Sequence, residues 1–215
     1  MADQPYSRDH FVPIDEEPRH HLVIENEFVR AFAVEIAPHD RTLCHQHNHD
    51  YLMYVAGDAE IVSVPRDDEP KKLSYRDGDC ELSQAGMVHV VENRKDTPFR
   101  NIVAELLLGA GGLRRSPHPK VIGGQVTIIP AFEDDRAEVL VLHMGADSRL
   151  AVFGPALLAS PYGQPIELLE SDGNRGKLCG FNELKWMPAS YQAILMDHTS
   201  NAARVVLIAV GNARG

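Results

Sequence analysis

Hydrophobic and polar residues alternate in short runs along most of this chain. In the segment 29–36, Phe32, Val34 and Ile36 occupy every second position, which is the period of a strand with one buried face. Similar runs cover residues 52–55, 60–64, 87–91 and 101–107, and segments rich in Pro, Gly, Asp and Asn separate them. This pattern predicts an all-β fold, arranged as an antiparallel sandwich or barrel.

The pattern changes twice and so divides the chain. Residues 1–20 are polar and contain Pro, which predicts an N-terminal arm, and residues 109–120 (GAGGLRRSPHPK) are rich in Gly and Pro, which predicts a linker. The strand-like runs resume after the linker, and residues 155–161 (PALLASP) are interpreted as a short helix or a loop. We therefore expect a first β domain over residues 21–108 and a second one over residues 121–215.

The charge balance limits the classes of partner. The chain has 21 Lys and Arg residues against 31 Asp and Glu residues, a net charge of −10, which disfavours binding to nucleic acid or to an anionic membrane surface. No apolar run approaches the ~20 residues that a transmembrane helix needs, and the first residues lack the apolar stretch of a signal peptide. The three cysteines are odd in number and contain no CxxC pair, which suits a reducing cytoplasm.

Histidines are concentrated in the first half, most densely in the segment HQHNH at residues 45–49. Alternate residues of a strand share a face and lie ~6.6–6.8 Å apart along it. His45 and His47 can therefore direct their imidazoles at one metal ion. A third ligand must come from another strand, and His89 is the natural candidate.

The spacing around these histidines resembles the motifs of the cupin superfamily. Its second motif reads G-x5-P-x-G-x2-H-x3-N, and Gly78, Gly86, His89 and Asn93 fall on this pattern, with Gln84 in place of the Pro. The HxH of its first motif is matched by His45 and His47. The resemblance covers residues 22–108 and implies that the three histidines bind a metal inside a jelly-roll barrel.

The first motif departs from the family at its glutamate. Tyr51 stands four residues after His47, on the same face by parity, and we expect it to act as a catalytic proton donor or to contact the ligands. Asp50 has the family's spacing to Gly57 and becomes a fourth ligand only if a bulge reverses its parity. His49 shares the ligand face and is a further candidate ligand.

The second half follows the same motifs without their ligands. When residues 121–213 are laid over the first domain, Ala151, Phe153 and Ala193 take the three histidine positions. None of these side chains binds a metal. We therefore expect a degenerate second barrel, and an overall fold of two tandem cupin-type jelly-roll barrels (double-stranded β-helices).

The resemblance implies a metal-dependent protein with one divalent transition metal per chain. Three-histidine iron sites occur in cupin dioxygenases, which favours Fe²⁺ and an oxygen-dependent reaction on a small organic substrate, although imidazole sites also suit Zn²⁺, Ni²⁺ or Cu²⁺, and Mn²⁺ is a further candidate. The alternatives are a non-catalytic small-molecule-binding cupin and an isomerase or lyase that uses the metal as a Lewis acid. Arg30, Arg41 and Arg100 are candidate substrate anchors. Exposed edge strands also lead us to expect a two-fold homodimer.

Overall fold

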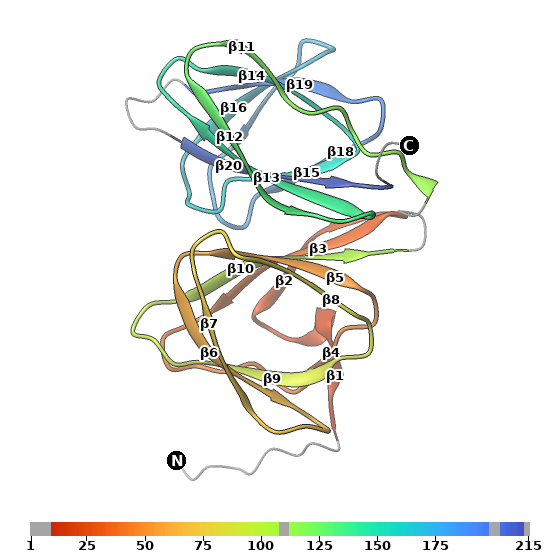
Figure 1. Cartoon of the computed structure of the whole chain (residues 1–215), viewed down its shortest axis with the longest axis vertical. Coiled ribbons are helices and arrows are strands. Elements are labelled where there is room, and N and C mark those ends of the chain that lie inside the picture. The colour runs from red at the N-terminus through yellow and green to blue at the C-terminus, as the bar shows by residue number, and fades with distance from the viewer. Residues whose placement is uncertain (1–9, 108–111, 198–202, 213–215) are drawn as a thin grey trace. The chain divides into compact units, whose positions relative to one another are not determined.

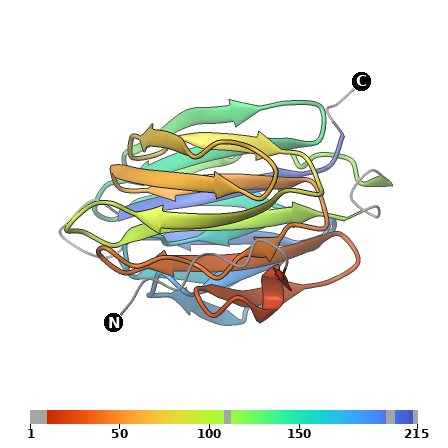
Figure 2. The ribbon, with the colours of Figure 1, turned by 90° about the horizontal axis from the view of Figure 1, so that it is seen from below.

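The computed structural model describes residues 10–107, 112–197 and 203–212, and these residues confirm the all-β prediction. They form four five-stranded sheets and one 3-10 turn, Ile14–Glu16, which is the red coil in Figure 2. The chain divides into two compact units. The first contains the described residues up to Leu22 together with Phe32–Glu105, and the second contains Val23–Ala31 and the described residues from Leu106 onward.

The first unit is built around two sheets (Figure 1). One has the strand order β1 (Val12–Pro13), β4 (His45–Gln46), β9 (Val88–Asn93), β6 (Ala59–Pro65) and β7 (Lys71–Tyr75). The other has the order β2 (His20–Glu25), β3 (Val29–Ile36), β10 (Phe99–Leu106), β5 (Tyr51–Ala56) and β8 (Cys80–Ser83), of which the end of β2 and the start of β3 are counted with the second unit.

The second unit repeats this topology. Its first sheet has the order β11 (Lys120–Gly123), β14 (Arg149–Phe153), β19 (Gln192–Met196), β16 (Ile166–Glu170) and β17 (Arg175–Leu178). Its second sheet has the order β12 (Val126–Glu133), β13 (Ala137–Met144), β20 (Ala203–Val210), β15 (Ala156–Ala159) and β18 (Leu184–Met187). Each strand of the first unit therefore has its counterpart ten strands later in the chain.

The described part of the predicted N-terminal arm belongs to the first unit. Val12 pairs in parallel with His45, and the side chain of Ile14 is completely buried in the core of that unit. The strand β1 thus lies directly beside the segment that carries the candidate ligands. Within the predicted linker, residues 109–111 lie outside the described residues, whereas Arg114 forms a bridge with Asn212 in the second unit.

The hydrophobic alternation located most of the inner strands. Phe32, Val34 and Ile36 are at most 1% exposed and form part of the core of the first unit, as their period of two predicts. The polar strands β7 and β8 gave no such signal because they are the outermost strands of their sheets. The interpretation of residues 155–161 as a helix or loop was wrong: β15 lies between β20 and β18, and all four of its residues are buried.

Among the described residues, no helix has the length and apolarity that crossing a lipid bilayer requires.

Candidate metal centre

The fold brings the three histidines of the motifs together inside the first unit. His45 and His89 are directly opposite each other on β4 and β9, and their ring centroids lie 4.7 Å apart. The Nε2 atoms of His47 and His89 approach to 3.4 Å. All three side chains are buried, with exposures of 0%, 2% and 7% for His45, His47 and His89.

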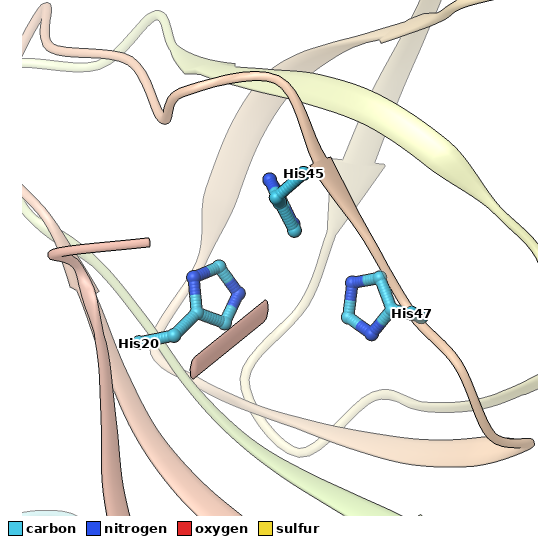
Figure 3. A group of neighbouring side chains, drawn as sticks. All are labelled: His20, His45 and His47. Atoms are coloured by element: carbon cyan, nitrogen blue, oxygen red, sulfur yellow. The ribbon is translucent and has the colours of Figure 1, made fainter. Parts of the chain in front are cut away.

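A fourth histidine, which the sequence did not reveal, joins them from the start of β2. One ligand atom from each of His20, His45 and His47 lies within 4.8 Å of the other two, and Figure 3 shows the three imidazoles around a common space. His89 lies outside this mutually close trio and reaches the cluster through its contact with His47. His20 belongs to no spacing motif, and its only signal was an acidic residue, Glu17, three positions earlier.

Hydrogen bonds orient three of the four rings through their Nδ1 atoms. His45 Nδ1 donates to the Leu43 carbonyl at 3.0 Å, so its Nε2 carries the lone pair. His20 Nδ1 lies 2.7 Å from Glu17 Oε2, and His89 Nδ1 lies 3.2 Å from Ser63 Oγ. This is how metal-binding histidines are commonly held, with one nitrogen fixed by the protein and the other available to the ion.

The cluster contains buried nitrogen atoms that no described residue satisfies. They are His45 Nε2 and His47 Nδ1. A buried polar atom without a partner is unfavourable by about 1–3 kcal/mol, and a metal ion would remove that cost for a nitrogen that binds it. His45 Nε2 is the unpaired nitrogen that such an ion would satisfy, and His47 would bind through Nε2, which lies 3.4 Å from His89 Nε2; two nitrogens bound to one tetrahedral ion at ~2.0–2.1 Å are about as far apart. The residues present therefore fit a divalent metal ion.

Glu17 connects two of the histidines. Its Oε2 accepts from His20, and its Oε1 accepts the backbone N–H of Leu43 at 3.1 Å, while the Leu43 carbonyl holds His45. Burial acts to raise the pKa of Glu17, but the hydrogen bond and charge of His20 and the backbone N–H groups of Leu43 and Arg19 outweigh it and lower the pKa to about 2. Glu17 is therefore a buried carboxylate at neutral pH.

His45, His47 and His89 are neutral imidazoles, as metal binding requires. Burial lowers the pKa of His45 to about 4, and the neighbouring His20 adds to the effect. Burial, together with the neighbouring histidines, also lowers the pKa of His47 and of His89 far below the usual value. None of these three rings competes for a proton with a metal ion at pH 7.

The other predicted site residues surround the cluster in different ways. Tyr51 stacks on His47 with ring centroids 4.0 Å apart, and its hydroxyl donates to Met87 Sδ at 3.4 Å. Burial raises the pKa of Tyr51 to about 12, so its phenol is neutral. Asp50 Oδ1 accepts the backbone N–H of Ala85 at 2.8 Å, and neither Asp50 nor His49 belongs to the mutually close group of ligand atoms found among the described residues.

A cavity of about 230 Å³ extends from the histidines through the interior of the first unit. His20, His47 and His89 line it together with mostly apolar side chains from both sheets. The volume is below the ~300–1,000 Å³ typical of pockets for drug-sized ligands, so the cavity suits a smaller molecule. Its lining does not include the candidate anchors: Arg30 pairs with Glu25, Arg100 pairs with Glu35, and Arg41 forms an isolated bridge with Glu92.

The second unit has small apolar side chains at the equivalent place. Ala193 on β19 is opposite Val152 on β14, just as His89 is opposite His45, and both side chains belong to the core of that unit. The sequence overlay placed Ala151 there, one residue too early. A shift of one residue exchanges the two faces of a strand, and Ala151 and Phe153 are accordingly only half-buried.

No protein-family model matches the sequence, and no curated protein is detectably similar to it. Solved structures match the fold at low identity. AerE from Microcystis aeruginosa is 12% identical with a TM-score of 0.62, over 89% of this chain and 96% of that one. Salicylate 1,2-dioxygenase from Pseudaminobacter salicylatoxidans is 13% identical with a TM-score of 0.57, over 86% of this chain and 71% of the enzyme.

A third similar structure is named for the fold itself. It is a cupin 2 conserved barrel domain protein from Leptotrichia buccalis, 14% identical with a TM-score of 0.52, and the match covers 89% of this chain and 88% of that protein. At such identities the likeness concerns the fold, and it agrees with the motif resemblance and with the repeated strand order. The chain therefore has the two-domain cupin fold.

Proposed function

We propose that this protein is a metal-dependent cupin that binds one divalent transition metal per chain in its first unit. The observation that carries the proposal is the cluster of buried imidazoles, three of them held at Nδ1. The proposed ligands are His45, His47 and His89, with His20 as a fourth that Glu17 orients. Fe²⁺ is the favoured ion, and Zn²⁺, Ni²⁺, Mn²⁺ and Cu²⁺ are the competitors.

The favoured activity is that of a dioxygenase acting on a small organic substrate. A bound Fe²⁺ supplies the ability to react with O₂. The protein supplies a cavity with an apolar lining, which excludes water from the substrate. Tyr51 supplies a neutral phenol against His47, where it holds a proton at its hydroxyl oxygen. The salicylate dioxygenase of the same fold supports this choice by analogy alone.

A non-redox function is the second candidate, and the number of imidazoles favours it. Four histidines meet in the cluster, which matches the four-coordinate shell of Zn²⁺. If all four imidazoles bound such an ion, no position would be open for a substrate. The first unit would then be a binding module, whereas three ligands and one open position would suit an isomerase or lyase.

Elemental analysis of the purified protein tests the metal. We expect about one ion per chain, and loss of that ion in His47→Ala. His49→Ala is the matched control, because His49 is two residues away and outside the ligand group of the described residues. Equal metal in wild type and His47→Ala contradicts the proposal. An oxygen electrode, with Fe²⁺-loaded protein and small aromatic or diketone substrates, then separates the dioxygenase from the non-redox functions.

We also propose that the protein is a cytoplasmic homodimer. Cys44, Cys80 and Cys179 form no disulfide with one another, which supports a reducing compartment. The two-fold dimer rests on the outermost strands, such as β7 and β12, since exposed edges favour pairing. Light scattering should give twice the chain mass of 23.8 kDa, and the mass of one chain at all micromolar concentrations would contradict the dimer.

A further inference from the structure

The buried face of β10 carries two polar residues among apolar ones: Asn101, and Glu105, which is paired with Tyr51 of β5. Phe99, Asn101 and Val103 alternate along this strand, and all three line the cavity of the first unit. Phe99 and Val103 belong to the apolar core, whereas the position between them carries a carboxamide. Asn101 is only 3% exposed, so this amide lies inside the protein and borders the cavity.

The Asn101 side chain forms no hydrogen bond with any other described residue. Asn93, the other buried asparagine of this unit, behaves in the opposite way: its Nδ2 donates to the carbonyls of Ile36, Ala37 and Thr97 at 2.8–3.1 Å. Buried amides are nearly always paired, because an unpaired one is unfavourable. Asn93 has a structural role, whereas the amide of Asn101 borders the cavity and has no such set of bonds to the described residues.

We propose that Asn101 is a specificity-determining residue that hydrogen-bonds a polar group of the substrate. This inference rests on the proposed function, in which the histidine cluster holds the metal at the same cavity. The substrate would be a small, flat organic molecule with two polar groups and an apolar body between them. One group points to the metal and the other to the Asn101 amide, which can both donate and accept.

The remainder of the cavity supports this substrate class. The rings of Tyr75 and Phe99, which both line it, are parallel to within 3°, with centroids 6.4 Å apart, and they offer flat apolar surfaces. The Tyr75 hydroxyl already donates to Glu81 at 2.8 Å. Asn101 therefore offers the substrate a buried amide that no described residue uses.

Thermal unfolding of the metal-free full-length protein tests the state of the amide. Replacing an unpaired buried amide by an apolar group removes the cost of burying it. The melting temperature of Asn101→Ala should therefore equal that of wild type, and the melting temperature of Asn101→Leu should be equal or higher by ~2–8 °C. The control Asn93→Leu removes three hydrogen bonds and should lower the melting temperature or abolish folding. A melting temperature that falls in both Asn101 variants as it does in Asn93→Leu overturns the proposal, because the amide would then be structural.

Calorimetric titration of the Zn²⁺-loaded protein tests recognition. 4-Hydroxybenzoate carries two polar groups across a ring, and benzoate lacks the second. Wild type should prefer 4-hydroxybenzoate by about tenfold, the value of one hydrogen bond, and Asn101→Leu should lose this preference. The inference is overturned if wild type and Asn101→Leu bind both probes with equal affinity, or if neither protein binds either probe. Metal content separates the failure of this inference from the failure of the proposed function. Asn101→Leu should hold as much Zn²⁺ as wild type. A wild type that binds no Zn²⁺ would reject the proposed function instead.

Discussion

The two units share one strand order and differ in what fills their interiors. In the first, His45 on β4 faces His89 on β9, and at the same place in the second, Val152 on β14 faces Ala193 on β19. The same strand order therefore forms whether this pair of positions carries imidazoles, as in the first unit, or aliphatic side chains, as in the second. Burying imidazoles, two of them with unsatisfied nitrogens, is less favourable than burying valine and alanine. The difference indicates that chemistry, and not folding, accounts for the histidines of the first unit.

The most direct way to break this comparison is to give the first unit the residues of the second. We expect His45→Val combined with His89→Ala to fold, because Val152 and Ala193 complete the same pair of strands. It should lose its metal, from about one ion per chain to below ~0.1, because two of the imidazole ligands are gone. Elemental analysis measures this, and His143→Ala in the second unit is the control. Full metal content in the double variant would place the metal elsewhere.

Tyr51→Phe should show the next largest effect. The variant removes the phenol oxygen and keeps the ring that stacks on His47, so metal content should not change. Turnover should fall by ~10²–10⁴-fold if the phenol transfers a proton. The matched variant Asp50→Asn should also keep its metal, since Asp50 Oδ1 accepts a backbone N–H from Ala85. Loss of metal in Asp50→Asn with an unaffected Tyr51→Phe would reverse the two roles.

The sequence predicted the parts of the site that depend on local spacing. His45 and His47 alternate within one segment, and His89 lies in a motif whose glycines fix its turn, with Gly78 and Gly86 at φ +91° and +90°. His20 was missed because its place depends on where β2 lies next to the cluster, which no local pattern encodes. Asn101 was missed for a related reason: only the cavity shows that its amide has no use in the core.

The same limit explains the errors in the second half. Without histidines to anchor the alignment, the overlay put Ala151 where the structure has Val152, and one residue is enough to reverse the face. Residues 155–161 are rich in Ala and Leu, which favour helices, but their place between two strands determines their conformation. Long-range pairing decided both cases.

Glu17→Gln should sharpen the comparison, because the corresponding segment of the second unit, between β11 and β12, is Gly124–Gln125 and carries no carboxylate. The substitution keeps the shape of the side chain and removes the charge beside His20. We expect metal affinity to fall by ~10–100-fold, as is typical when the partner of a metal-binding histidine is changed. Competition with a chelator measures the affinity, and Glu16→Gln, which is exposed, is the control. Equal affinities of the two variants would exclude His20 and Glu17 from the metal centre.

The last effect concerns pH and the metal-free protein. Histidines of the unfolded chain take up protons near pH ~6.5, whereas folded His45 does so only near pH 4. Acidification from pH 6.5 to 4 therefore favours the unfolded state, and the shift of His45 alone corresponds to roughly 3 kcal/mol. Below pH 4.5, protonation of Glu17 in the unfolded chain adds to the loss, because its folded pKa is about 2.

Urea unfolding at pH 7 and at pH 5 tests this dependence. Wild type without metal should lose stability between these values, and the variant with His45→Val and His89→Ala should lose less, because it has exchanged two buried imidazoles for groups that do not titrate. With metal present, the wild type should instead lose less stability at pH 5 than the double variant, since an ion bound to neutral imidazoles stabilises only the wild type. An equal pH dependence of the two metal-free proteins would mean that the histidines of the first unit are not held neutral by burial. The contrast between the two interiors would then have no electrostatic consequence.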